Sequence, residues 1–136
     1  MRIASKKPNT LKLHDNISGS DLGLYFRTPT AKEQAAYTNG MTKRIRNKIV
    51  NCTGECRQKH GKEILEGWRE GDFGEEVNGQ AVAVSSVPGK PGYREDWKDW
   101  FQQYNADLVE RIAIHAFENT SETNDTEELP GEPDPD

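Results

Sequence analysis

Alternation of apolar and polar side chains predicts strands near the start of the chain. Residues 10–14 alternate between the two kinds of side chain, and residues 22–27 form a second short, largely apolar run. Both patterns are typical of strands. Residues 15–21 between them are rich in Asp, Asn, Ser and Gly, which favour turns. We therefore predict a short N-terminal β-hairpin.

A helical pattern begins after this hairpin. Thr30 followed by Glu33 forms a capping box, which is a signal for a helix start. Apolar or weakly polar residues then recur mostly in steps of four, as on one helix face. They are Tyr37, Met41, Ile45, Ile49, Cys52, Cys56, His60, Ile64 and Trp68. We predict a helix from about 30 to 53, a break near Gly54 or Gly61, and helical structure again to about Trp68.

The second half of the chain predicts a loop and then two more helices. Glycines punctuate residues 67–79, which we expect to be a loop, and residues 80–85 alternate weakly like a short strand. Four aromatic residues then recur with a helical period, which predicts one helix. We predict a second helix that begins after residues 105–107 and ends near Asn119. The aromatic residues are Trp97, Trp100, Phe101 and Tyr104.

These elements predict a mainly α (α+β) fold, with a short N-terminal β-hairpin followed by three to four helices. Residues 1–9 are interpreted as a flexible basic arm and residues 10–118 as a single helical domain. The segment from Glu118 to the end holds eight acidic residues, three Pro and no Lys or Arg. Because it cannot bury enough apolar surface to offset chain entropy, we predict a disordered acidic tail over 119–136.

Composition adds a charge asymmetry to this picture. Residues 1–63 hold 13 Lys and Arg against 5 Asp and Glu, whereas residues 64–136 hold 5 against 18. Such a split concerns partners and solubility rather than fold. No apolar run is long enough for a membrane span, no secretory signal is visible, and the chain has only two cysteines. We expect a protein of a reducing cytosol that does not bind membranes.

Candidate chemistry is sparse. Cys52, Cys56 and His60 are spaced by four residues on one predicted helix, which would suit part of a zinc site. The favoured interpretation is that these three side chains extend the core stripe. We found no phosphate-binding Gly-rich loop, serine nucleophile elbow or metalloprotease helix. The sequence therefore predicts a protein that is not an enzyme and needs no cofactor.

Two groups of residues suggest binding to a macromolecule instead. Exposed aromatic and Met side chains commonly anchor protein interfaces. Our candidates for partner contact are Tyr37, Met41, Trp68, Phe73, Trp97, Trp100 and Phe101. The alternative is a small nucleic-acid-binding or regulatory module, which would use the basic face of the predicted helix. That face would present Lys43, Arg44, Arg46 and Lys48.

Three segments resemble the tail assembly chaperones of long-tailed bacteriophages and prophages. The first, Leu24–Glu33, is an expected strand followed by the pattern R-T-P-T-x-x-E at a helix start. The second, Ile64–Gly74, holds a helix end with a Trp and an acidic, Gly-bearing loop. The third, Tyr104–Ile112, is similar to the last helix of the family. Together these segments span roughly residues 22–118.

The resemblance implies a role in phage tail assembly in the cytoplasm of the bacterial host cell. Such chaperones bind the long, helical tape measure protein before the tail tube forms around it, and they help to recruit tube subunits. No catalytic residue is implied. By resemblance, we expect the partners to be the tape measure protein and the tail tube protein, with nucleic acid less favoured and homo-oligomers left open.

Overall fold

The computed structural model describes residues 9–16, 18–118 and 127–129. The predicted basic arm at 1–9 therefore lies, apart from Asn9, outside the described residues. The predicted disordered tail at 119–136 lies outside them as well, apart from Glu127–Leu129. These three residues form strand β8, which pairs in parallel with the first strand of the chain. Disorder is thus the wrong prediction for this short stretch.

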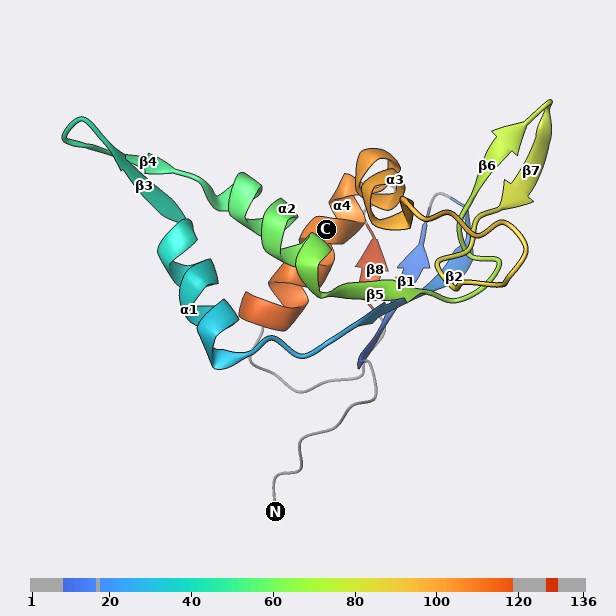
Figure 1. Cartoon of the computed structure of the whole chain (residues 1–136), viewed down its shortest axis with the longest axis horizontal. Helices are drawn as coiled ribbons and strands as arrows, with labels where there is room; N and C mark the ends of the chain where they lie inside the picture. The colour runs from blue at the N-terminus through green and yellow to red at the C-terminus, as the bar shows by residue number, and fades with distance from the viewer. Residues whose placement is uncertain (1–8, 17, 119–126, 130–136) are drawn as a thin grey trace, which may run out of the picture. The chain divides into compact units, whose positions relative to one another are not determined.

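The prediction of a mainly α fold is wrong, because the described residues form an α+β structure with eight strands in three sheets (Figure 1). The chain divides into two compact units. Unit 1 comprises residues 1–26, 66–97 and 123–136, and unit 2 comprises residues 27–65 and 98–122. Each unit is described separately below.

Unit 1 is built on a four-stranded sheet with the order β5-β2-β1-β8. Strands β1 (Asn9–Asp15) and β2 (Ser20–Phe26) form an antiparallel hairpin at the place where the sequence predicts one. Leu11 and Leu13 are buried whereas Thr10 and Lys12 are exposed, as the alternating pattern requires. Because β1 and β2 occupy the two middle positions in the strand order, the predicted hairpin forms the centre of a larger sheet.

Trp68, at the end of β5 (Leu65–Trp68), organises the rest of the core of unit 1. Its indole N–H donates to the Val84 carbonyl oxygen at 2.9 Å. Its ring meets Phe73 and Trp97 edge-on, with ring centroids 5.7 Å apart in both pairs. The chain is extended here, so the predicted helical structure up to Trp68 is wrong beyond Ile64.

The predicted loop at 67–79 is also partly wrong. Strands β6 (Gly74–Val77) and β7 (Gln80–Ala83) form a two-stranded hairpin. Asn78 and Gly79 form its turn, and both have a positive φ, of 52° and 80°. Two such residues in a row are typical of a type I′ turn, whose twist matches that of the flanking strands.

Unit 2 consists of helices and one hairpin. Its helical segments are α1 (Ala31–Gly40), α2 (Thr53–Ile64), most of α3 (Trp97–Tyr104), α4 (Ala106–Ala113) and the π-helical turn η1 (Ile114–Glu118). Helix α2 packs against both α1 and α4. The centre of the core of unit 2 is formed by five side chains that are almost completely buried. They are Tyr37, Ile64, Phe101, Val109 and Ile112.

The predicted helix over 30–53 ends at Gly40. Strands β3 (Thr42–Ile45) and β4 (Lys48–Asn51) replace its second half with an antiparallel hairpin. Arg46 and Asn47 form the turn with φ of 54° and 67°, which a continuous α-helix cannot contain. Helix α2 then runs through both Gly54 and Gly61 without a break.

Candidate interaction surfaces

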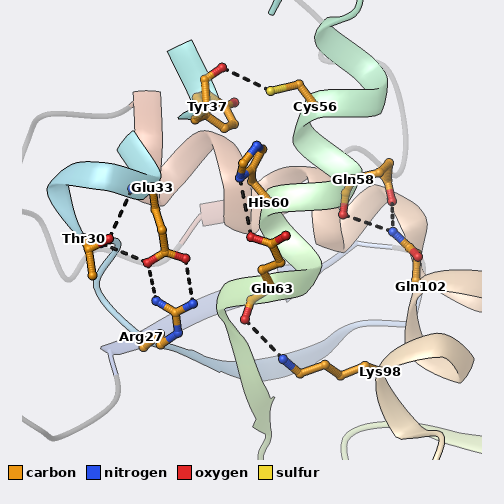
Figure 2. Close-up of polar contacts among 10 residues, drawn as sticks. All are labelled: Arg27, Thr30, Glu33, Tyr37, Cys56, Gln58, His60, Glu63, Lys98 and Gln102. Atoms are coloured by element: carbon orange, nitrogen blue, oxygen red, sulfur yellow. Dashed lines mark hydrogen bonds and ion pairs between the residues drawn. The ribbon is translucent and has the colours of Figure 1, made fainter. Parts of the chain in front are cut away.

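The R-T-P-T-x-x-E segment holds the start of α1 together (Figure 2). Thr30 accepts a hydrogen bond from the Glu33 backbone N–H at 3.2 Å, and the Glu33 carboxylate accepts one from the Thr30 N–H at 3.1 Å. The Arg27 guanidinium donates to both carboxylate oxygens of Glu33, at 2.5 and 2.7 Å. The hydrogen bonds from Arg27, together with those from Thr30, lower the pKa of Glu33 to about 2. The predicted capping box is confirmed, and its role is structural.

The second segment of the resemblance has a similar structural role in unit 1. Asp72 accepts a hydrogen bond from the Gly23 backbone N–H at 2.8 Å and pairs with the Arg69 guanidinium at 3.0 Å. Arg69 also donates to the Asp21 carbonyl oxygen at 2.7 Å. This segment therefore attaches to strand β2. The contacts of Arg69 and Asp72 therefore stabilise the fold.

Most of the predicted partner-binding aromatic residues are buried. Tyr37 is only 2% exposed. Its ring stacks on Phe117 with ring centroids 4.2 Å apart, and its hydroxyl donates a hydrogen bond to Glu118. Burial and the Glu118 carboxylate raise the pKa of Tyr37, so that the phenol stays protonated. Trp68, Phe73, Trp100 and Phe101 are buried as well, whereas Met41 and Trp97 are half-exposed.

The two cysteines and His60 lie beside a cavity of about 280 Å³ between α1, β3 and α2. Cys56 donates to the Tyr37 carbonyl oxygen at 3.2 Å, and burial raises the pKa of its thiol, which makes it a poor nucleophile. His60 meets the rings of Tyr37 and Phe117 edge-on, and its Nδ1 lies 3.7 Å from the Glu63 carboxylate (Figure 2). Among the described residues, no three His, Cys, Asp or Glu side chains are placed to hold a metal ion together.

The predicted basic helix face is instead a basic β-hairpin, made of β3, β4 and the turn between them. All of Thr42–Asn51 except the two turn residues lie in strands, and every residue of this segment is exposed. No hydrogen bond or ion pair to the side chains of its four cations is present within the described part of the chain. These cations are Lys43, Arg44, Arg46 and Lys48.

Sequence reasoning missed the apolar side chains that the structure leaves exposed. Ile45, Ile49 and Val50 on the β3–β4 hairpin are 47%, 77% and 39% exposed. The four-residue period assigns both isoleucines to a buried helix stripe, which is wrong. Tyr104, at the end of α3, is 66% exposed beside the buried ring of Trp100. An amphipathic pattern alone cannot separate such a position from the core.

The β6–β7 hairpin of unit 1 exposes apolar side chains as well. Val77 and Val82 are each 43% exposed, and Glu76, next to Val77 in the strand, is exposed too. Glu75 is half-buried and pairs with the Arg94 guanidinium at 3.4 Å, which also pairs with Asp96 at 2.9 Å. One cation is thus shared between two carboxylates, and the surface of this hairpin is acidic.

Comparison with known proteins adds no assignment: no family model, curated protein or solved structure matches the chain. Within the described residues, no helix combines the length and apolar character that crossing a membrane requires.

Proposed function

We propose that this chain is a non-enzymatic binding protein of the bacterial cytoplasm and that it acts as a phage tail assembly chaperone. The observation that carries the binding role is the set of large apolar side chains left exposed on three folded elements. These elements are the β3–β4 hairpin, the β6–β7 hairpin and the end of α3. The resemblance of residues 22–118 to tail assembly chaperones supports the specific process.

Tyr104 is the residue that we assign to contact with the client, the tape measure protein. Tyrosine is enriched at the energetic centres of protein interfaces, because its ring supplies a large contact area and its hydroxyl a hydrogen bond. Tyr104 is 66% exposed at the end of α3 and lies against the buried Trp100. A client helix that covered Tyr104 would bury an aromatic surface which the fold itself leaves in water.

Co-expression tests this function. Candidate tape measure and tube proteins from the genome that encodes this chain would be produced with it or with an unrelated control protein. We expect the tape measure protein to stay soluble and to co-purify only with this chain. A tape measure protein that aggregates equally in both cases would refute the chaperone role.

Two variants locate the client contact. Tyr104→Ser should reduce co-purification of the tape measure protein at least several-fold, because an interface anchor of this kind contributes about 2 kcal/mol. Val87→Ser is the matched control, since Val87 is also exposed, at 41%, but lies in a loop of unit 1. Circular dichroism and a thermal melt would verify that both variants are folded.

Nucleic-acid binding through the four cations of the β3–β4 hairpin is the second candidate. Neutralising four phosphates would give a slope of about −3.6 for log K against log salt on duplex DNA. Binding of a short DNA duplex, measured by fluorescence anisotropy over a range of salt concentrations, separates this function from a contact made by apolar side chains.

A further inference from the structure

The cavity of unit 2 holds chemistry that the proposed function does not use. It lies between α1, β3 and α2 and has a volume of about 280 Å³, just below the range of about 300–1,000 Å³ that is usual for small-molecule sites. Lys43 and Lys59 line it together with one carboxylate, Glu55. Within the described part of the chain, neither lysine side chain forms a hydrogen bond or an ion pair. The cavity is therefore suited to a small anion.

His60 lines the same cavity and lacks a hydrogen-bond partner. Its side chain is only 7% exposed, and its Nδ1 has no hydrogen-bond partner among the described residues. The Glu63 carboxylate, 3.7 Å away, is too distant for a hydrogen bond (Figure 2). Buried polar side chains nearly always have a partner, so an imidazole without one points to a polar group from outside the chain.

The two cysteines that line the cavity differ in their access to solvent. Cys56 is 5% exposed and donates a hydrogen bond to the Tyr37 carbonyl oxygen. Cys52 is half-buried and occupies the N-cap position of α2, where its side chain makes no capping hydrogen bond. Its Sγ makes a long contact of 3.8 Å with the Val50 carbonyl oxygen. A reagent in the cavity can therefore reach Cys52 more easily than Cys56.

We infer that Cys52 is a modification site for small anionic disulfides. The Cys52 thiolate attacks one sulfur of the reagent, whose S–S bond breaks, and the other half leaves as a thiolate with the electron pair of that bond. A new S–S bond joins Cys52 to the first half, and the proton lost by Cys52 passes to water or to the leaving thiolate. The anionic group of the attached half then lies in the cavity beside Lys43 and Lys59, where His60 can donate a hydrogen bond to it.

The charges of the cavity select the reagent, and the buried thiol preserves the product. Lys43 and Lys59 raise the local concentration of an anionic disulfide, and salt should weaken this attraction. Cys56 does not attack the product, because it stays buried and bonded to the Tyr37 carbonyl oxygen. The mixed disulfide should therefore persist until an external thiol reduces it.

Exchange with two disulfides of different charge tests the proposal. The probes are oxidised glutathione, which is anionic at neutral pH, and hydroxyethyl disulfide, which is neutral. Intact mass spectrometry of the folded full chain would follow adduct formation over time, and peptide mapping would identify the modified cysteine. We expect a single glutathione on Cys52 and none on Cys52→Ser. Serine is a favoured N-cap residue, so this variant should fold.

Removal of the two lysines tests whether the cavity selects anions. Lys43→Gln with Lys59→Gln should slow exchange with oxidised glutathione about ten-fold and leave exchange with hydroxyethyl disulfide almost unchanged. Lys32→Gln with Lys90→Gln removes the same charge from exposed positions outside the cavity and should react like the wild type. If the two double variants react equally with glutathione, or if the neutral probe slows to the same extent, the proposal is wrong.

NMR measures separately where the attached group lies. The imidazole signals of His60 should shift when the glutathione adduct forms, whereas those of His14, on β1 of unit 1, should not. Unchanged His60 signals would show that the attached group remains in solvent, and the proposal would fail. An adduct on Cys56, or an internal disulfide between the two cysteines in place of the adduct, would overturn it as well.

Discussion

At the scale of single residues, the start of α1 shows what local sequence can and cannot predict. Thr30 and Glu33 are three positions apart, so their reciprocal hydrogen bonds depend only on a local helix start, and the capping box was predictable. The bidentate pair with Arg27 was not predicted, because it depends on the path of the backbone between Arg27 and Thr30. The residue types were visible in the sequence, but the path of the backbone was not.

The Glu33 carboxylate should make stability depend on pH in acid. Its pKa falls from 4.5 to about 2 on folding, so the ionised form is stabilised in the folded state. That stability is fully present above pH 4.5 and is lost as pH falls toward about 2. Glu33→Gln should lower the free energy of unfolding by about 1 kcal/mol at neutral pH and flatten this acid dependence.

Urea denaturation between neutral pH and about pH 3 measures both effects. Glu55→Gln is the matched control, because Glu55 is an exposed carboxylate in the first turn of α2. It should leave the acid dependence almost unchanged. If Glu33→Gln lost stability in acid as steeply as the wild-type chain does, groups other than Glu33 would control the acid response.

At the scale of elements, the helices near the aromatic stripe were easier to predict than the β3–β4 hairpin. Trp97–Tyr104 and the helix after Asn105 follow a clear helical period and occur as α3 and α4. The β3–β4 hairpin was missed because Ile45 and Ile49 are four residues apart, as on a helix. The deciding feature is a turn at Arg46 and Asn47 with positive φ, and Arg-Asn is not a strong turn signal.

Gly61 shows why a glycine in a helical pattern need not break a helix. A Cβ at this position would overlap the Val109 carbonyl oxygen of α4, so the missing side chain allows α2 and α4 to approach closely. Gly61→Ala should destabilise the protein, although alanine favours a helix over glycine by about 1 kcal/mol. A Cβ at Gly54 would meet open space, with no described atom within 4 Å, so Gly54→Ala should stabilise the protein.

Thermal melts of the two alanine variants measure this contrast. Both glycines lie in α2, so alanine gains helix propensity at each, and an opposite sign of the two effects isolates the close approach at Gly61. Equal stabilisation of both variants would show that α2 and α4 can move apart without cost.

At the scale of the whole molecule, the exposed cations of the β3–β4 hairpin and the exposed aromatic ring of α3 lie on different elements. The basic half found in the sequence places four exposed cations on the β3–β4 hairpin, whereas the end of α3 exposes an aromatic ring. The first surface suits the second candidate function, contact with the phosphates of a nucleic acid, and the second suits the proposed contact with a client. These two contacts should respond differently to salt, because screening acts on charges and not on apolar burial.

Salt should therefore separate the two contacts in one preparation. At about 0.1 M salt the screening length is about 10 Å, and at about 1 M it falls to about 3 Å. Over this range we expect binding of a short DNA duplex through the hairpin to disappear in fluorescence anisotropy, while the tape measure protein still co-purifies with the chain. If the client is released by salt as well, client binding depends on the charged hairpin. Tyr104→Ser would then leave co-purification unchanged at low salt, and the client contact would have to be assigned to the β3–β4 hairpin.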